Sequence, residues 1–160
     1  MRLTSAVRQD DEFSKAKRCS FQFLKVRNRS QKEIKDQLNK KKFNPQTIEQ
    51  TVQYLKSVDL INDRQFARDW IRIRLNKPFG LRRIFFELKN IKGISEEILK
   101  EEITLARQDF KEEPTIEALA KKCALKYKNL EAAKRKRRLY EYLARRGFNI
   151  DIITKVIERI

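Results

Sequence analysis

The sequence predicts an all-α fold, an elongated, curved array of three tandem three-helix repeats, and two observations lead to this prediction. Apolar residues recur three and four positions apart along most of the 160-residue chain. This is the spacing of an amphipathic helix, whereas the alternation typical of strands is weak. The 3 glycines and 3 prolines lie where this periodicity breaks, so they mark the ends of helices.

One set of apolar positions occurs three times. The sets are Ile34, Leu38, Phe43, Ile48 and Val52, then Ile84, Leu88, Ile94, Leu99 and Ile103, then Leu139, Leu143, Phe148, Ile153 and Ile157. The third set keeps the spacing of the first, whereas the second contains one extra residue before Gly93. A period of roughly 50 residues is typical of stacked helical arrays, which expose an extended surface for other macromolecules.

In the first repeat we predict helices at residues 14–27, 30–41 and 45–57. Ser30 is followed three positions later by Glu33, which is the pattern of a capping box. Asn44 places a capping side chain directly before Pro45, a residue that fits the first position of a helix.

In the second repeat we predict helices at residues 63–76, 81–91 and 95–107. Asn62 and Gln65 form a second capping pattern, and Glu96 and Glu97 place negative charge in a first turn, where the helix dipole favours it. The expected core stripe of the first of these helices is Phe66, Trp70 and Ile73. Trp70 is therefore expected to be largely buried.

In the third repeat the predicted helices are 114–127, 131–146 and 150–159. Ile116, Ala120 and Cys123 correspond to the stripe of the second repeat, and Gly147 follows the middle helix. The predicted organisation is a flexible N-terminal extension at 1–13, with repeats at 14–61, 62–107 and 108–160.

Composition favours an acidic partner and excludes several kinds of chemistry. The chain has 39 Lys and Arg against 22 Asp and Glu, a formal charge of +17, so nucleic acid or an acidic protein surface is the leading partner class. The sequence has 0 His, which removes the commonest general base and imidazole-based zinc sites. No catalytic residue, cofactor or metal site is expected. Cys19 and Cys123 are expected to be reduced thiols.

No run of 18 apolar residues occurs, and charges interrupt the first residues of the chain. We therefore expect a cytoplasmic protein that neither spans a membrane nor carries a secretory signal.

A basic surface is predicted around the start of the second repeat. Arg64, Arg68 and Arg72 follow one another at four-residue intervals and are expected to point away from the core. The predicted partner-binding set adds Arg74, Lys77, Phe79, Arg82 and Arg83. Asp69 is the one acid between Arg64 and Arg83, so few local carboxylates neutralise this surface. The alternative is a solvated basic helix face.

Two further charged groups invite a functional interpretation. Lys134, Arg135, Lys136, Arg137 and Arg138 form a dense basic run. This run predicts electrostatic affinity for DNA or RNA, and the alternative is again a solvated helix. The acidic residues Glu96, Glu97, Glu101 and Glu102 are expected to be a solvated face paired with nearby lysines. Phe79, between a proline and a glycine, is expected to be an exposed contact.

The middle of the chain resembles the signature of the RecX family of bacterial regulatory proteins. The resemblance rests on residues 60–70 (Leu-Ile-Asn-Asp-Arg-Gln-Phe-Ala-Arg-Asp-Trp), Arg74, Phe79 with Gly80, Arg83 with Ile84, Glu87 with Leu88, and the Lys92-Gly93-Ile94-Ser95 turn. The stretch from Arg29 to Leu38 and the Lys-Lys-Phe element ending at Phe43 also match. Two residues depart from the pattern: Ile91 is extra, and Lys42 stands where the first unit often has glycine.

The resemblance implies a non-enzymatic modulator of the RecA recombinase. Such a protein binds in the helical groove of the RecA filament on single-stranded DNA, limits filament growth, and so represses ATP hydrolysis and strand exchange. A monomer with weak, non-specific affinity for single-stranded DNA is expected. The alternative is a basic helical-repeat protein that binds DNA directly, as helix-turn-helix proteins do.

Overall fold

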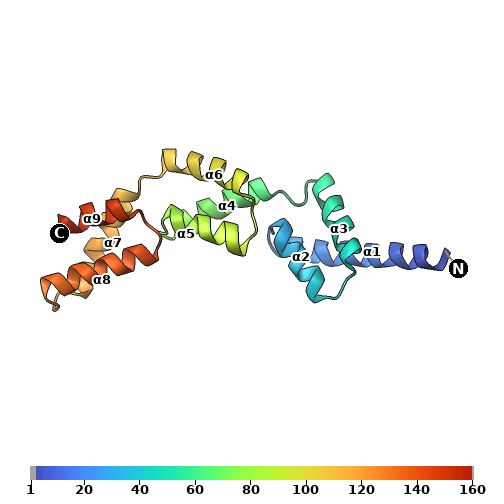
Figure 1. Cartoon of the computed structure of the whole chain (residues 1–160), viewed down its shortest axis with the longest axis horizontal. Coiled ribbons are helices and arrows are strands. Elements are labelled where there is room, and N and C mark those ends of the chain that lie inside the picture. Colours follow the sequence, from blue (N-terminus) through green and yellow to red (C-terminus); the bar gives the residue numbers. More distant parts are fainter. Residues whose placement is uncertain (1–2, 160) are drawn as a thin grey trace.

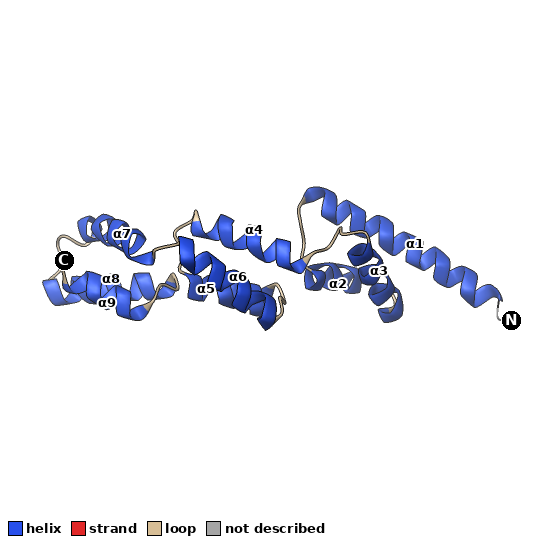
Figure 2. Ribbon diagram, turned by 90° about the horizontal axis from the view of Figure 1, so that it is seen from above, coloured by secondary structure: helices blue, strands red, loops and turns tan. Residues whose placement is uncertain are grey.

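The computed structural model of the protein describes residues 3–159, and within them every regular element is a helix (Figure 2). The elements are α1 (Leu3–Val26), α2 (Gln31–Lys40), α3 (Pro45–Ser57), α4 (Asp63–Leu75), α5 (Leu81–Phe86), the π-helical turn η1 (Glu87–Ile91), α6 (Glu96–Asp109), α7 (Glu112–Lys126), α8 (Ala132–Arg145) and α9 (Ile150–Glu158). The all-α prediction is confirmed for this part of the chain.

Three units of three helices follow one another along the long axis, with the two ends of the chain at opposite ends of the array (Figure 1). Unit 1 contains α1 to α3, unit 2 contains α4 to α6 with η1, and unit 3 contains α7 to α9. Each unit has its own cluster of buried apolar side chains. The predicted array of three tandem units is therefore confirmed.

The repeated apolar positions are the core positions of the three units. Fourteen of the fifteen are buried, and Phe43 is partly buried against the core of unit 1. The backbone repeats as well, because the residue before each connecting apolar residue has a positive φ: 63° at Lys42, 70° at Gly93 and 81° at Gly147. Lys42 adopts this left-handed conformation without being glycine.

Helix α1 is longer than the sequence predicted. The expected helix covered residues 14–27, but residues 3–13, which were assigned to a flexible extension, are helical. The carboxylate of Glu12 accepts hydrogen bonds from the Asn44 amide (2.8 Å) and the Thr47 hydroxyl (3.1 Å) at the start of α3. Phe13 packs edge-on against Tyr54. Glu12 and Phe13, at the end of the segment 3–13, are therefore part of unit 1.

The expected core stripe of α4 is wrong at Ile73, whose exposed fraction is 49%. Ala67 and Ile71 are buried instead, and Trp70 is partly buried with its ring stacked on Phe66. The packed face of α4 runs through Ala67 and Ile71, and Ile73 lies about 200° around the helix from Ile71. Arg74 lies on the packed face and pairs with a buried carboxylate of η1.

Ionised side chains form the first junction, between units 1 and 2. Glu33 accepts two hydrogen bonds from Arg27, both 2.9 Å, and one from Lys92 of unit 2 at 2.6 Å. The Gln31 amide donates to Asp63 at 2.8 Å, and the Ser30 hydroxyl donates to the Lys92 carbonyl at 2.7 Å. Ser30 also caps α2 with Glu33, as predicted.

Backbone groups form much of the second junction, between units 2 and 3. The Gly80 amide donates to the Arg146 carbonyl (2.9 Å), and the Arg82 amide donates to the Gly147 carbonyl (3.2 Å). A Cβ on Gly80 would lie 2.2 Å from the Gly147 carbonyl oxygen. Glu112 accepts from the Leu81 amide (3.1 Å) and from the Asn149 amide (2.7 Å), so one carboxylate joins the starts of α5 and α9.

Candidate partner-binding surface

The arginines of α4 are not free of carboxylates, because α6 packs against this helix. Arg64 binds Glu101 and also donates to Glu102 at 3.1 Å. Arg68 donates to both oxygens of Glu102, at 2.8 and 3.0 Å. The Glu102 side chain is only 1% exposed, so it is not part of a solvated acidic face. The premise that this surface lacks neutralising carboxylates is therefore wrong for Arg64 and Arg68.

The electrostatics of Glu102 fit a structural role for this pair of arginines. The hydrogen bond from Arg68 lowers the pKa of Glu102 by more than burial raises it, and the hydrogen bond from Arg64 lowers that pKa further. The carboxylate therefore stays charged between the two guanidinium groups. Arg64 and Arg68 hold α4 against α6, and each presents only part of its guanidinium to solvent.

A second ion-pair cluster surrounds Glu87 in η1. Arg74 donates to both of its oxygens, Arg83 donates at 3.1 Å, and the Trp70 indole donates at 3.2 Å. Burial alone would raise the pKa of Glu87, but the hydrogen bonds from Arg74, Arg83 and Trp70 lower it overall. Two members of the predicted partner-binding set are thus committed to a buried carboxylate.

Phe79 lies among guanidinium groups instead of standing exposed. Its ring centroid is 4.2 Å from Arg74, 4.4 Å from Arg83 and 5.3 Å from Arg146, and the ring is partly buried against the core of unit 2. Stacked guanidinium groups gain cation–π attraction, which favours this packing. Arg146 also donates to the Pro78 carbonyl at 3.1 Å. Phe79 therefore helps to join units 2 and 3.

Three members of the predicted set remain at the surface. Arg72 is exposed, and its one ion pair within the described residues is with Asp69 of its own helix, at 3.1 Å. Lys77 and Arg82 are exposed, and within the described residues neither makes an ion pair. The structure thus divides the predicted surface into internal pairs and a smaller group of available cations.

The second basic run lies at the start of α8, far from α4 along the array (Figure 1). Arg137 and Arg138 approach Glu141 at 3.7 and 4.0 Å. Lys134, Arg135 and Lys136 make no ion pair among residues 9–159. The two sequence-predicted basic groups are therefore separate surfaces, on units 2 and 3.

Sequence reasoning missed the residues that shape the second junction. Arg145 and Arg146, at the end of α8, lie beside α5, and Glu112 bridges two helix starts. The sequence did offer a signal for this junction, namely the glycines at positions 80 and 147. Glycine often marks a place where two backbones approach closely, and these two glycines do meet in the structure.

Three family models match the chain in order. They describe the first three-helix domain of RecX at residues 16–55, the second at 62–102 and the third at 112–157. A protein described as regulatory protein RecX from Prosthecochloris aestuarii (strain DSM 271 / SK 413) is 30% identical over 152 residues, which cover 94% of this chain and 97% of the relative. This chain belongs to the RecX family.

Other RecX proteins agree with this membership. Regulatory protein RecX of Clostridium perfringens (strain SM101 / Type A) is 28% identical over 153 residues, covering 95% of this chain and 71% of the relative. The crystal structure of RecX from Lactobacillus salivarius superposes with a TM-score of 0.81 at 26% identity, covering 94% of this chain and 97% of that one. A second crystal structure of regulatory protein RecX gives 0.86 at 21% identity and supports the fold alone.

Membership in the RecX family identifies a regulatory protein. Within the described residues no helix is long and apolar enough to cross a membrane. The same residues contain no cluster of three or more Cys, Asp or Glu side chains placed to hold a metal ion.

Proposed function

We propose that this protein binds the RecA filament on single-stranded DNA and limits its extension, so that ATP hydrolysis and strand exchange fall. The observation that carries the proposal is the ordered match of all three RecX domains along the chain. An elongated array with a formal charge of +17 suits a long, acidic nucleoprotein surface. The protein acts by occupying that surface, without catalysis, as a cytoplasmic monomer.

Unit 2 makes the protein-specific contact in this proposal. Arg72, Lys77 and Arg82 are its available cations, and Arg64, Arg68, Arg74, Arg83 and Phe79 set the shape that presents them. The free protein binds single-stranded DNA weakly and without sequence preference through the start of α8. Counterion release then makes the affinity fall with salt, with a slope of about −0.7 per neutralised phosphate.

The direct test adds the protein, below the molar amount of RecA, to RecA on single-stranded DNA and follows ATP hydrolysis. Progressive inhibition supports the proposal. No inhibition, together with tight and sequence-selective binding to duplex DNA, supports the rival function of a direct DNA-binding protein. Sedimentation of the free protein reports whether it is a monomer.

Two matched variants separate the two basic surfaces. Arg72→Gln with Lys77→Gln removes available cations from unit 2, and Lys134→Gln with Lys136→Gln removes the same charge from unit 3. We expect the first to weaken inhibition and the second to weaken free DNA binding. Equal loss of inhibition from both would mean a general electrostatic attraction.

A further inference from the structure

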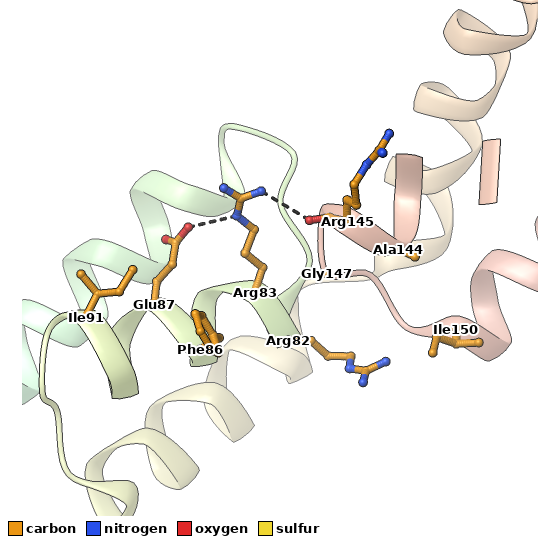
Figure 3. A pocket seen from close by; sticks show the side chains of 9 residues that line it. All are labelled: Arg82, Arg83, Phe86, Glu87, Ile91, Ala144, Arg145, Gly147 and Ile150. Atoms are coloured by element: carbon orange, nitrogen blue, oxygen red, sulfur yellow. Dashed lines mark hydrogen bonds and ion pairs between the residues drawn. The ribbon is translucent and has the colours of Figure 1, made fainter. Parts of the chain in front are cut away.

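A groove runs along the second junction and combines apolar and basic side chains from two units. It has a volume of about 590 Å³ and is lined by Arg82, Arg83, Phe86, Glu87, Ile91, Ala144, Arg145, Gly147 and Ile150. Figure 3 shows α5 and η1 on one side and the end of α8 with the start of α9 on the other. Glu87 is the one carboxylate of this lining, and Arg74 and Arg83 already occupy it, so the groove is suited to binding.

Three exposed apolar side chains line the groove. Phe86 is 59% exposed, Ile91 is 55% exposed and Ile150 is 42% exposed. The first two come from unit 2 and the third from unit 3, so neither core accounts for them. Exposed apolar side chains scattered singly need no explanation, but three around one concave surface indicate a place where a partner is buried.

The extra residue of unit 2 builds one wall of this groove. In units 1 and 3 five positions separate the last core residue of the second helix from the connecting apolar residue, and in unit 2 there are six. The structure accommodates the addition as η1, in which the Lys92 amide donates to the Glu87 carbonyl five residues earlier, at 3.0 Å. Ile91 ends this widened turn. Such π-helical turns are frequent at functional sites.

Arginines on both sides give the groove its charge. Arg83 is occupied, because it donates to Glu87 and to the Arg145 carbonyl. Arg82 extends toward Ile150, and the Arg145 guanidinium points away from Arg83 at the rim (Figure 3). Within the described residues, neither Arg82 nor Arg145 pairs with a carboxylate. Both guanidinium groups are therefore available to an acidic ligand.

We propose that this groove binds an acidic protein segment that carries a large apolar side chain, with the apolar side chain against Phe86 and Ile91 and carboxylates on Arg82 and Arg145. Guanidinium groups bind carboxylates through paired hydrogen bonds, and apolar anchors in pockets dominate protein interfaces. A nucleic-acid ligand fits less well because Phe86 is the one ring in this lining, whereas Ile91 and Ile150 are aliphatic and offer no surface for stacking successive bases. The inference rests on the proposed function, since it assigns a protein contact within the filament.

The binding test uses the full chain and a fluorescein-labelled synthetic peptide of aspartate and glutamate around a central Leu-Phe pair. The comparison probes are the same peptide with serine at both central positions and a labelled oligodeoxythymidylate. The apolar groove variant is Phe86→Ser with Ile91→Ser, and the charge variant is Arg82→Gln with Arg145→Gln. Their controls are Leu125→Ser, an exposed apolar residue of α7, and Lys121→Gln with Lys122→Gln.

We expect each groove variant to weaken binding of the Leu-Phe peptide about tenfold, a change of about 1.4 kcal/mol. The control variants and oligodeoxythymidylate binding should change by less than about twofold, because rim charges far from a contact contribute little. All substituted side chains are exposed, and circular dichroism confirms that each variant folds. Equal affinity for the serine peptide, or unchanged affinity in both groove variants, would overturn the proposal.

The RecA assay separates failure of this inference from failure of the proposed function. If the wild-type protein inhibits ATP hydrolysis and the groove variants inhibit it less, both stand. If the groove variants inhibit as strongly as the wild-type protein, the groove is not the contact, while the regulatory function stands. If the wild-type protein does not inhibit RecA at all, the proposed function fails, and the filament contact inferred here fails with it.

Discussion

The two junctions of the array differ in the groups that form them. Ionised side chains dominate the first, where Glu33 joins Arg27 to Lys92 across units 1 and 2. In the second, backbone hydrogen bonds at Gly80 and Arg82 and the contact of Gly80 with Gly147 predominate, and Glu112 and Arg146 add bonds to backbone groups of unit 2. The two junctions lie at comparable places in the repeat but are formed mainly by different kinds of interaction.

The difference means that the two junctions respond to different perturbations. An ion pair weakens with salt and with protonation of its acid. A close backbone contact is insensitive to both but does not tolerate an added Cβ. The first junction therefore responds more strongly to salt and acid than the second, in which the backbone contact of Gly80 with Gly147 carries no charge.

The largest expected effect is that of Gly80→Ala on the second junction. Gly80 has a φ of −76°, so alanine fits its backbone conformation, but the new Cβ would meet the Gly147 backbone at 2.2 to 2.3 Å. We expect a loss of about 1–3 kcal/mol, the range for overpacking. Hydrogen exchange should accelerate at the amides of Gly80 and Arg82.

Gly93→Ala is the matched control for that substitution. Its Cβ would lie 2.4 Å from Lys32 Cδ and 2.8 Å from Lys32 Cβ, so both the Lys32 side chain and the start of α2 would have to shift, and the positive φ of Gly93 adds strain. The backbone conformation alone should cost about 1–2 kcal/mol. Exchange at Gly80 should remain as in the wild type. If Gly93→Ala accelerated exchange at Gly80 as much as Gly80→Ala does, the two junctions would not be independent.

Glu33→Gln should open the first junction by a smaller amount. The substitution leaves Lys92, whose side chain is 12% exposed, without its carboxylate, at a cost on the order of 1 kcal/mol. In the wild type, added salt should weaken this junction, and in the variant most of that salt dependence should be gone. Amide exchange at Gln31 measures both effects, and a full salt dependence in the variant would contradict this assignment.

Acid should act on the first junction through the same carboxylate. Burial would raise the pKa of Glu33, but hydrogen bonds from Arg27 and Lys92 lower it to about 2, against an ordinary value of 4.5. A lowered folded-state pKa stabilises the fold above the ordinary value, and this contribution is lost as pH falls from about 4.5 toward 2. In the wild type, the amide NMR shifts of Ser30 and Gln31 should change with pH as Glu33 titrates. In the Glu33→Gln variant this pH dependence should be absent.

The helices and their repeat followed from the sequence, whereas the pairing of charges did not. Apolar spacing located Ile34, Ile84 and Leu139 in three cores because burial depends on periodicity that one helix displays by itself. The partners of Arg64 and Arg68 lie on α6, more than thirty residues away, and no local pattern indicated them. Sequence reasoning therefore treated these arginines as outward-facing, although they are joined to a buried carboxylate.

This finding also changes the expected result of substituting the α4 arginines. From the sequence, glutamine at these sites should leave stability nearly unchanged. With Glu102 buried beneath them, losing both Arg64 and Arg68 leaves a buried carboxylate without its guanidinium partners, so the double variant should be less stable than the wild type. Arg72 is the α4 position for which a near-neutral substitution is still expected.

The smallest expected effect is a gain of stability in unit 1. Lys42 has a φ of 63° where the other units have glycine, and a non-glycine residue in that conformation is strained. Lys42→Gly should raise the free energy of unfolding by about 0.5–1 kcal/mol, after allowing for the greater freedom of glycine in the unfolded chain. Thermal unfolding measures this gain. The control is Lys41→Gly, because Lys41 has an ordinary φ of −83° and glycine there should lower the free energy of unfolding.

The widened turn η1 shows how a repeat can gain a residue without losing its register. One residue added inside an α-helix rotates everything that follows by about 100° around the axis. Here the rotation is absorbed within Glu87–Ile91, and Ile94, Leu99 and Ile103 still reach the core of unit 2. Repeats of this kind can therefore diverge in length at the end of the second helix, where each addition changes the outer surface and leaves the interior intact.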